Sequence, residues 1–203
     1  MTRRTPTGAA VLQPEITRSI TEAVLNELAE QGFARMSMEA VAKRAGVGKS
    51  ALYRRWPSKQ EMAMAVISEF SVSRAISVDT GSLRGDLRET LDALLEWLTH
   101  PRFSRILPDL IAETARNPEL AEVVATMIGI PRRDRGTELL QRAITRGELA
   151  ADLPTELALD IIPATLYWRL SVRATPLEPG ELDTLTDMLL RALGAKPAAA
   201  QPH

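Results

Sequence analysis

The chain has 203 residues with a net charge of −1, and its 45% hydrophobic and 25% charged residues are an ordinary balance for a globular protein. The absence of cysteine excludes disulfides and thiolate metal sites, and two histidines are too few for a histidine metal cluster, so we expect neither a metal nor a cofactor. No apolar run approaches the roughly 20 residues of a membrane span, and no apolar signal segment follows the basic start, which predicts a cytoplasmic protein. Residues 1–70 hold 10 basic and 7 acidic side chains against 15 and 19 in the remainder, so only the first third of the chain is suited to attract phosphate.

Apolar residues recur at helical spacing almost throughout, without the strict alternation of strands, which predicts an all-α fold of nine helices and no sheet. Gly32 should end the first helix in the left-handed conformation and bring Phe33 back onto Leu28. Ser58 and Glu61 are spaced as a capping box, which starts the fourth helix. The nine predicted helices span about residues 14–32, 37–45, 48–56, 58–78, 83–99, 103–115, 117–146, 154–174 and 181–193.

The segment from Gly46 to Ser50, Gly-Val-Gly-Lys-Ser, ends like a phosphate-binding P-loop. That motif requires a glycine five residues before Gly48, where this chain has Lys43. It also requires a strand upstream, where the sequence predicts a short helix. We therefore reject a nucleotide-binding site at this position.

The same segment fits a helix-turn-helix, in which two short helices, 37–45 and 48–56, are joined by a tight glycine turn. Small Ala42 allows the helices to cross closely, and Leu52 and Trp56 lie four residues apart on the inward side. The outward side of the second helix carries two cations, a hydroxyl and a phenol but no carboxylate: Lys49, Arg54, Ser50 and Tyr53. This chemistry suits a DNA major groove and its phosphates. A merely solvated face is the alternative, which the glycine turn, the caps and the spacing together disfavour.

The segment from Phe33 to Lys59, FARMSMEAVAKRAGVGKSALYRRWPSK, closely resembles the DNA-binding domain of the TetR family of bacterial transcriptional regulators. Residues 142–152 and 166–169 also resemble the ligand-binding half of one TetR subgroup, so that the resemblance covers about residues 15–193. One departure is Gly48, where many relatives carry serine. Glycine is an acceptable N-cap but has no hydroxyl to offer a phosphate.

The resemblance implies a role for each residue of the outward face. Lys49 and Ser50, at the start of the recognition helix, would meet base edges. Tyr53 would donate a hydrogen bond to a phosphate, and Arg54 would lie beside it.

The flanking elements are also given roles by the resemblance. Ser37 and Lys59 would clamp the DNA backbone on either side, each helped by a helix N-terminus, and Arg44 would contact a base or a phosphate. Arg3 and Arg4 would either enter a minor groove or form an unstructured basic start, and both interpretations stay open.

The second half of the chain concentrates aromatic and methionine residues, each of which could simply fill a helical core. Pro108, Pro131 and Pro163 should interrupt three helices, and broken helices pack imperfectly and leave cavities. The resemblance implies a pocket for a small-molecule effector among these helices. Because few charges fall at inward positions, we expect an apolar or weakly polar ligand. The candidate wall residues are Trp97, Phe103, Leu107, Ile111, Met127 and Tyr167.

The last two predicted helices carry more apolar side chains than one small bundle readily buries. Two copies forming a four-helix bundle would cover them, and the resemblance implies the same homodimer. A two-fold symmetric protein reads a palindrome. The candidate interface residues are Ile161, Ile162, Leu166, Leu170, Leu185, Met188 and Leu189.

Together these inferences predict a repressor that binds a palindromic double-stranded DNA operator as a homodimer, with no membrane partner. A small-molecule effector would release it by moving the helix from Lys59 to about Val78. One alternative is a small-molecule-binding helical protein without operator recognition. Another is an enzyme that uses carboxylates as acid and base, and the candidate residues would be Glu113, Glu138 and Asp160. No cofactor motif supports catalysis.

The predicted domains are a flexible arm (1–13), the helix-turn-helix domain (14–60), the ligand-binding and dimerisation domain (61–193) and a flexible tail (194–203).

Overall fold

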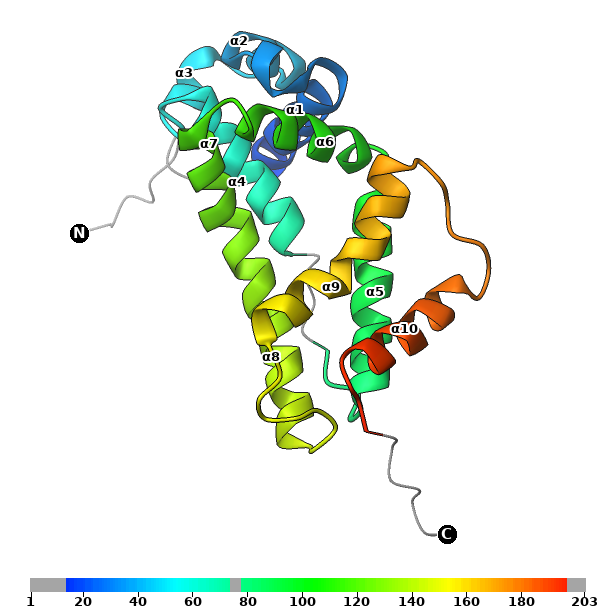
Figure 1. The fold of residues 1–203 in the computed structure, drawn as a ribbon. Coiled ribbons are helices and arrows are strands. Elements are labelled where there is room, and N and C mark those ends of the chain that lie inside the picture. Colours follow the sequence, from blue (N-terminus) through cyan, green and yellow to red (C-terminus); the bar gives the residue numbers. More distant parts are fainter. Residues whose placement is uncertain (1–13, 74–77, 197–203) are drawn as a thin grey trace, which may run out of the picture.

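The computed structural model describes residues 14–73 and 78–196, and within these ranges it contains helices and no strand, which confirms the predicted all-α fold (Figure 1). The predicted arm, residues 1–13, and residues 197–203 of the predicted tail lie outside the described ranges. Among the described helices, none is both long enough and apolar enough to cross a membrane.

The helices form nine continuous runs over the described ranges, because the π-helical turn η1 joins α7 to α8 and the π-helical turn η2 extends α9. α1, α2 and α3 lie together at one end of the molecule, and α4 runs from them into the larger helical domain (Figure 1). There α9 crosses between α8 and α5, and α10 packs on α5. The bounds are α1 Pro14–Arg35, α2 Met38–Ala45, α3 Lys49–Tyr53, α4 Lys59–Val72, α5 Leu83–Thr99, α6 Phe103–Thr114, α7 Pro118–Val124, η1 Ala125–Gly129, α8 Ile130–Thr145, α9 Thr155–Tyr167, η2 Trp168–Val172 and α10 Glu181–Ala192.

Side-chain caps start the helices of the small domain where the sequence predicts them. Ser37 Oγ accepts a hydrogen bond from the backbone N–H of Ala40 at 3.1 Å, and Ser58 Oγ accepts one from Glu61 at 3.1 Å. Gly46 ends α2 where the sequence predicts the glycine turn, and it adopts the left-handed conformation, with φ 68° and ψ 28°. These local signals matter because helices as short as α2 and α3 are not stable by propensity alone.

Gly32 interrupts α1 in a different way from the predicted left-handed cap. Its φ of 76° is positive, but its ψ of 166° is extended, and one further helical turn follows through Arg35. The backbone N–H of the buried Phe33 donates to Asp109 Oδ2 of α6 at 2.7 Å. The interruption therefore turns the end of α1 onto the larger domain.

Several helix lengths also differ from the sequence prediction. α4 ends six residues before Val78, whose carbonyl oxygen instead accepts a hydrogen bond from Arg142 Nη2 at 2.6 Å. Pro108 and Pro163 lie inside α6 and α9 without splitting either helix. Pro131 is the second residue of α8, in the first turn after the wide turn η1, where its missing backbone donor is accommodated.

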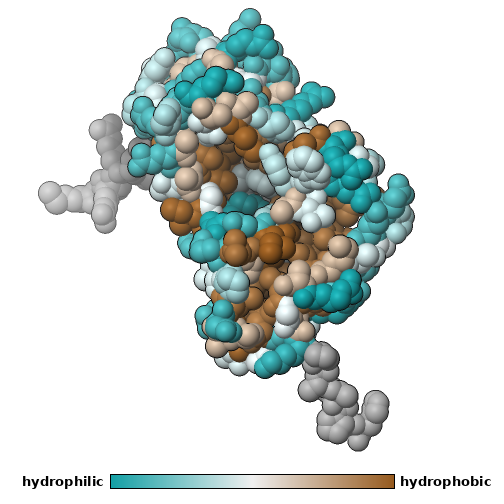
Figure 2. Space-filling view, viewed as in Figure 1, coloured by the Kyte–Doolittle hydropathy of each residue, from teal (hydrophilic) through white to brown (hydrophobic). Residues whose placement is uncertain are grey.

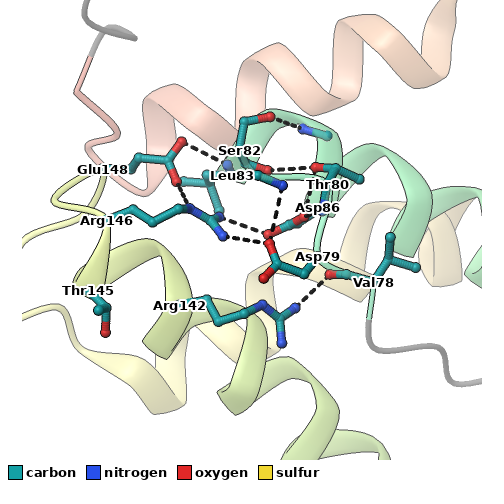
Figure 3. A network of polar contacts seen from close by, with 12 residues as sticks. Val78, Asp79, Thr80, Ser82, Leu83, Asp86, Arg142, Thr145, Arg146 and Glu148 are labelled. Atoms are coloured by element: carbon teal, nitrogen blue, oxygen red, sulfur yellow. Dashed lines mark hydrogen bonds and ion pairs between the residues drawn. The ribbon is translucent and has the colours of Figure 1, made fainter.

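A buried polar network fixes the start of α5 to the end of α8 (Figure 3). The fully buried Asp86 carboxylate accepts hydrogen bonds from the backbone N–H of Thr80 at 2.7 Å and from Arg146 Nη2 at 2.8 Å. Arg146 Nε also donates to Glu148, whose other carboxylate oxygen accepts from the backbone N–H of Leu83. Every charged group in this network has a partner of opposite charge or a hydrogen bond. These contacts offset the free-energy cost of burying the charged groups.

Candidate functional site

The joint between α2 and α3 is a helix-turn-helix built from the predicted residues. After the left-handed Gly46, the backbone N–H of Val47 donates back to the Ala42 carbonyl at 3.0 Å and closes the turn. Gly48 then forms the N-cap of α3 without a side-chain hydrogen bond. Leu52 is completely buried, so the inward side of α3 is fixed against the small domain.

The outward side of α3 is exposed as the sequence predicts. Lys49, Ser50, Tyr53 and Arg54 are all exposed, and the Tyr53 ring retains 48% of its accessible surface. The Lys49 ammonium pairs with Glu39 at 2.9 Å, and this hydrogen bond lowers the pKa of the Glu39 carboxyl. Because both partners are exposed, such a pair contributes little to stability and is readily exchanged for a phosphate.

Ser37 and Arg44 lie beside this face but are engaged within the domain. The Ser37 hydroxyl oxygen caps α2, which leaves its hydrogen available to donate. The Arg44 guanidinium bridges two carboxylates of α1, with Nε 2.9 Å from Glu27 and Nη1 2.9 Å from Glu30. Glu27 is buried, so Arg44 neutralises an interior charge and holds α2 against α1.

Lys59, which the resemblance implies to be a phosphate clamp, makes contacts within the chain. Its ammonium lies 3.0 Å from the carbonyl oxygen of Phe33, 2.8 Å from that of Ala34 and 3.4 Å from that of Met36. The same nitrogen lies 5.1 Å from the centroid of the Phe33 ring. An ammonium has three donors, so Lys59 is occupied in capping the end of α1 and joining it to α4.

A cavity of about 450 Å³ lies in the larger domain, enclosed by α5, α6, α8 and α9. Figure 2 shows the surface hollowed between α6 and α9. Four of the predicted wall residues line it, namely Trp97, Leu107, Ile111 and Tyr167. The other two predicted wall residues do not line the cavity. Phe103 is buried between the rings of Phe70 and Trp97, and Met127 lies in η1 against α4.

The cavity wall also carries charges that the sequence analysis did not expect, so the expectation of few inward charges was wrong. Arg132, Arg133, Arg135 and Asp160 all line it. The helical spacing could have shown that Arg132 faces the cavity. Gly136 and Leu139 lie four and seven residues after Arg132, so all three residues share the side of α8 that lines the cavity. Within the described residues, no group of three or more His, Asp or Glu side chains is arranged to hold a metal ion.

Two contacts connect the cavity to the small domain. Leu107 and Ile111 of α6 line the cavity, and Asp109 between them accepts the hydrogen bond from Phe33. No α4 residue lines the cavity, although Arg132 donates to the carbonyl of Ser71 near the end of α4 at 2.8 Å. α6 and the contact of Arg132 with α4 are therefore two links between the cavity and the small domain, and the movement of the helix beginning at Lys59 stays a prediction.

The candidate interface residues on α9, η2 and α10 divide into two groups. Ile161 and Met188 are 42% and 54% exposed, and Leu170 is half-buried. The others are buried in the subunit's own core, because α9 and α10 pack on α5, and so cannot meet a partner directly: Ile162, Leu166, Leu185 and Leu189. Three exposed residues of the same helices were missed: Leu157, Trp168 and Val172. Figure 2 shows hydrophobic residues gathered along and below α9.

Comparison with known proteins assigns both halves of the chain to one family. Residues 20–66 match the model described as bacterial regulatory proteins, tetR family, and residues 77–189 match the tetracyclin repressor-like C-terminal domain. The DNA-binding transcriptional repressor TetR of Mycobacteroides abscessus is 31% identical over 170 residues, which cover 83% of this chain and 88% of that protein. The uncharacterized regulator YdeS of Bacillus subtilis is 30% identical over 76% of this chain and 78% of its own length.

Solved structures share the fold. The TetR family transcription regulator SCO0332 is 28% identical with a TM-score of 0.69, covering 87% of this chain and 97% of that one. GusR of Salmonella enterica superposes with a TM-score of 0.75 over 92% of this chain and all of that one, and at 22% identity it supports the fold alone. The match to both halves and the helix-turn-helix geometry identify the chain as a member of the TetR family, a helix-turn-helix transcriptional regulator and not an enzyme.

Proposed function

We propose that the chain is a repressor that binds a palindromic operator in double-stranded DNA as a homodimer and is released by a small molecule in the cavity. The observation that carries the proposal is the outward face of α3, where Lys49, Ser50, Tyr53 and Arg54 are exposed and the helix itself carries no carboxylate. The relative from Mycobacteroides abscessus is named a transcriptional repressor, which supports repression over activation for this chain.

In this proposal the start of α3 enters the major groove. Lys49 and Ser50 meet base edges, while Tyr53 and Arg54 contact phosphates on one strand. Ser37 contributes its free hydroxyl hydrogen from the N-terminus of α2. Arg44 and Lys59 act indirectly, since their ion pairs and hydrogen bonds hold α1, α2 and α4 in the geometry that presents α3.

The proposed homodimer uses the exposed apolar residues of α9, η2 and α10. Ile161, Trp168 and Met188 expose large apolar side chains on adjacent elements, and a second copy would bury them in a four-helix bundle. Pairing matters because a dimer places two α3 helices in successive major grooves, roughly 34–36 Å apart on B-DNA.

The proposed switch runs through α6. A ligand that displaces Leu107 or Ile111 also shifts Asp109, and with it the end of α1 that Asp109 holds. Such a shift changes the separation of the two α3 helices. The ligand releases the operator when it binds the altered conformation more tightly, by a coupling free energy that is typically about 1–3 kcal/mol.

The test begins with genomic DNA fragments selected by the purified full-length protein, followed by affinity measurement on the enriched sequence and its point variants. Lys49→Ala is expected to alter the preferred base at one position of each half-site, because Lys49 is placed at a base edge. Lys196→Ala, which removes the same charge from an exposed site beyond α10, should leave preference and affinity unchanged. Failure to enrich any sequence would favour a small-molecule-binding protein without operator recognition.

A further inference from the structure

The cavity contains a guanidinium with no carboxylate partner. Arg132 extends from the start of α8 into the cavity wall, where its guanidinium carbon lies 4.0 Å from the centroid of the Trp97 ring. Nη1 donates to the Ser71 carbonyl at 2.8 Å. Over residues 14–73 and 78–196, no Asp or Glu oxygen lies within ion-pair distance of Arg132, whereas neighbouring Arg133 pairs with two carboxylates.

Burial of this charge has an electrostatic cost. Desolvation lowers the pKa of the Arg132 guanidinium to about 10, so that the side chain still carries its full charge at neutral pH. A buried charge is ordinarily neutralised by a partner, because its removal from water is otherwise unfavourable. An anion entering the cavity would supply the partner that the chain itself does not.

A second donor in the same wall lacks an acceptor. The indole Nε1–H of Trp97 is buried and has no hydrogen-bond partner within the described structure, and the residue as a whole is only 6% exposed. Buried N–H groups of tryptophan are ordinarily paired. The residue that stacks on the guanidinium thus offers a second place for an acceptor oxygen.

The remaining wall is mostly apolar. Aliphatic side chains come from four helices, among them Leu94 of α5, Leu107 of α6, Leu139 of α8 and Leu159 of α9. The cavity volume of about 450 Å³ lies within the range typical of small-molecule sites. Arg133 and Arg135 also line the cavity, but each pairs with a carboxylate, which leaves the half-buried Arg132 as the unpaired cation of the wall. One unpaired cation in a mostly apolar wall favours a ligand with a single anionic group and a hydrophobic body over a sugar or a polyanion.

We propose that the effector is a hydrophobic carboxylic acid whose carboxylate binds the Arg132 guanidinium and whose apolar body packs against the leucines of α5, α6 and α8. The inference rests on the proposed ligand-regulated function and replaces the apolar or weakly polar ligand expected from the sequence. A carboxylate at this position competes with the Ser71 carbonyl for Arg132, and so loosens the contact between α8 and the end of α4.

The experiment uses pairs of ligands that differ only in charge. Decanoate, 2-naphthoate and related hydrophobic acids, each with its primary amide, are titrated into the full-length protein without DNA by isothermal calorimetry. The acids are expected to bind about 10- to 100-fold more tightly than their amides, the effect of a charge-assisted hydrogen bond in a buried site. Equal binding of acids and amides, or binding of no acid in the series, would overturn the proposal.

Variants at Arg132 assign the preference to this residue. Arg132→Met keeps the length of the side chain and should remove the preference for acids. Arg132→Lys, which preserves the charge, should retain most of the preference. Arg116→Met removes the same charge from an exposed site outside the cavity and should behave as wild type. Ligand binding is measured without DNA, so the two proposals fail separately. A protein that prefers acids but binds no operator would contradict the proposed function and would leave this inference intact.

Discussion

The Asp109 carboxylate of α6 accepts a hydrogen bond from the backbone N–H of Phe33, with Oδ2 and the nitrogen 2.7 Å apart, and this contact joins the cavity wall to the end of α1. Leu107 and Ile111, two residues to either side of Asp109, line the cavity. A single helix therefore contacts the ligand site and the DNA-binding domain at the same time. In the proposed switch, α6 is the element through which occupancy of the cavity reaches α3.

Replacement of Asp109 by alanine is expected to weaken the coupling between ligand and operator. The variant loses the acceptor for the Phe33 N–H, so that movement of α6 is no longer transmitted to α1. For allosteric pairs of sites, one ligand typically changes the affinity for the other by roughly 5- to 150-fold. In the Asp109 variant, a saturating acid should change operator affinity by a smaller factor than in the wild type, closer to one. Asp134→Ala, an exposed carboxylate on α8, is the matched control and should keep the full factor. An unchanged factor in the Asp109 variant would exclude this route.

Gly32→Ala should destabilise the protein through strain and through contact with Asp109. A Cβ on Gly32 would lie 2.7 Å from Asp109 Oδ1, and φ of 76° with extended ψ is a conformation that favours glycine. We expect a loss of about 1–3 kcal/mol in the free energy of unfolding, measured by urea titration. Gly46→Ala has a positive φ in the left-handed helical region and open space around the added Cβ, so its loss should be smaller. If Asp109→Ala relieves none of the Gly32→Ala defect, the predicted contact is absent.

The buried network of α5 and α8 should make stability depend on acid pH through Asp86. Burial alone would raise the pKa of this carboxyl, but hydrogen bonds from Thr80 and Arg146 outweigh burial and lower it below the ordinary value of about 3.9. Asp86 thus contributes stability that is fully present above its unfolded pKa and is lost as the pH falls through its folded pKa.

Asp86→Asn tests this dependence. At neutral pH the variant is expected to lose about 1–3 kcal/mol of unfolding free energy, because a charged acceptor of Arg146 is replaced by a neutral amide. The difference from wild type should shrink as the pH is lowered below about 4, in urea titrations at a series of pH values. A difference that stays constant down to acid pH would show that Asp86 is not ionised in the folded protein.

Met188→Glu is expected to shift the protein from dimer to monomer. Met188 is 54% exposed on α10, so a charge there does not disturb the subunit but would be buried without a partner in the proposed four-helix bundle. Analytical ultracentrifugation at micromolar concentration measures the shift. Ile130→Glu introduces the same charge at a residue of α8 that is 53% exposed, and should remain dimeric. Dissociation by the Ile130 variant alone would place the interface elsewhere.

Much of the small domain could be predicted from the sequence because its signals are local. Caps at Ser37 and Ser58 and the turn at Gly46 depend on residues within a few positions, and all three occur where the sequence predicts them. The outward side of α3 follows from the same reasoning, since burial of Leu52 fixes the orientation of a helix this short.

The roles of Lys59, Arg132 and Leu185 depended on tertiary contacts that spacing does not encode. Lys59 caps a helix that ends 24 residues earlier in the chain. Arg132 faces the cavity only because α8 packs with that side toward α5 and α9. Leu185 lies in an apolar stripe of α10, and the stripe alone does not distinguish packing on α5 from packing on a second subunit.

The central claim, that the outward face of α3 lies on duplex DNA, is tested most directly by the DNA affinity of Tyr53→Ala, measured beside the affinity and thermal stability of Lys59→Ala. We expect Tyr53→Ala to weaken binding to all sequences with unchanged thermal stability, because its ring is exposed and would reach a phosphate. Lys59→Ala should instead lower the melting temperature, since its ammonium caps α1. Wild-type affinity for Tyr53→Ala, together with a Lys59→Ala protein that is fully stable but binds DNA with a reduced salt slope, would contradict the account.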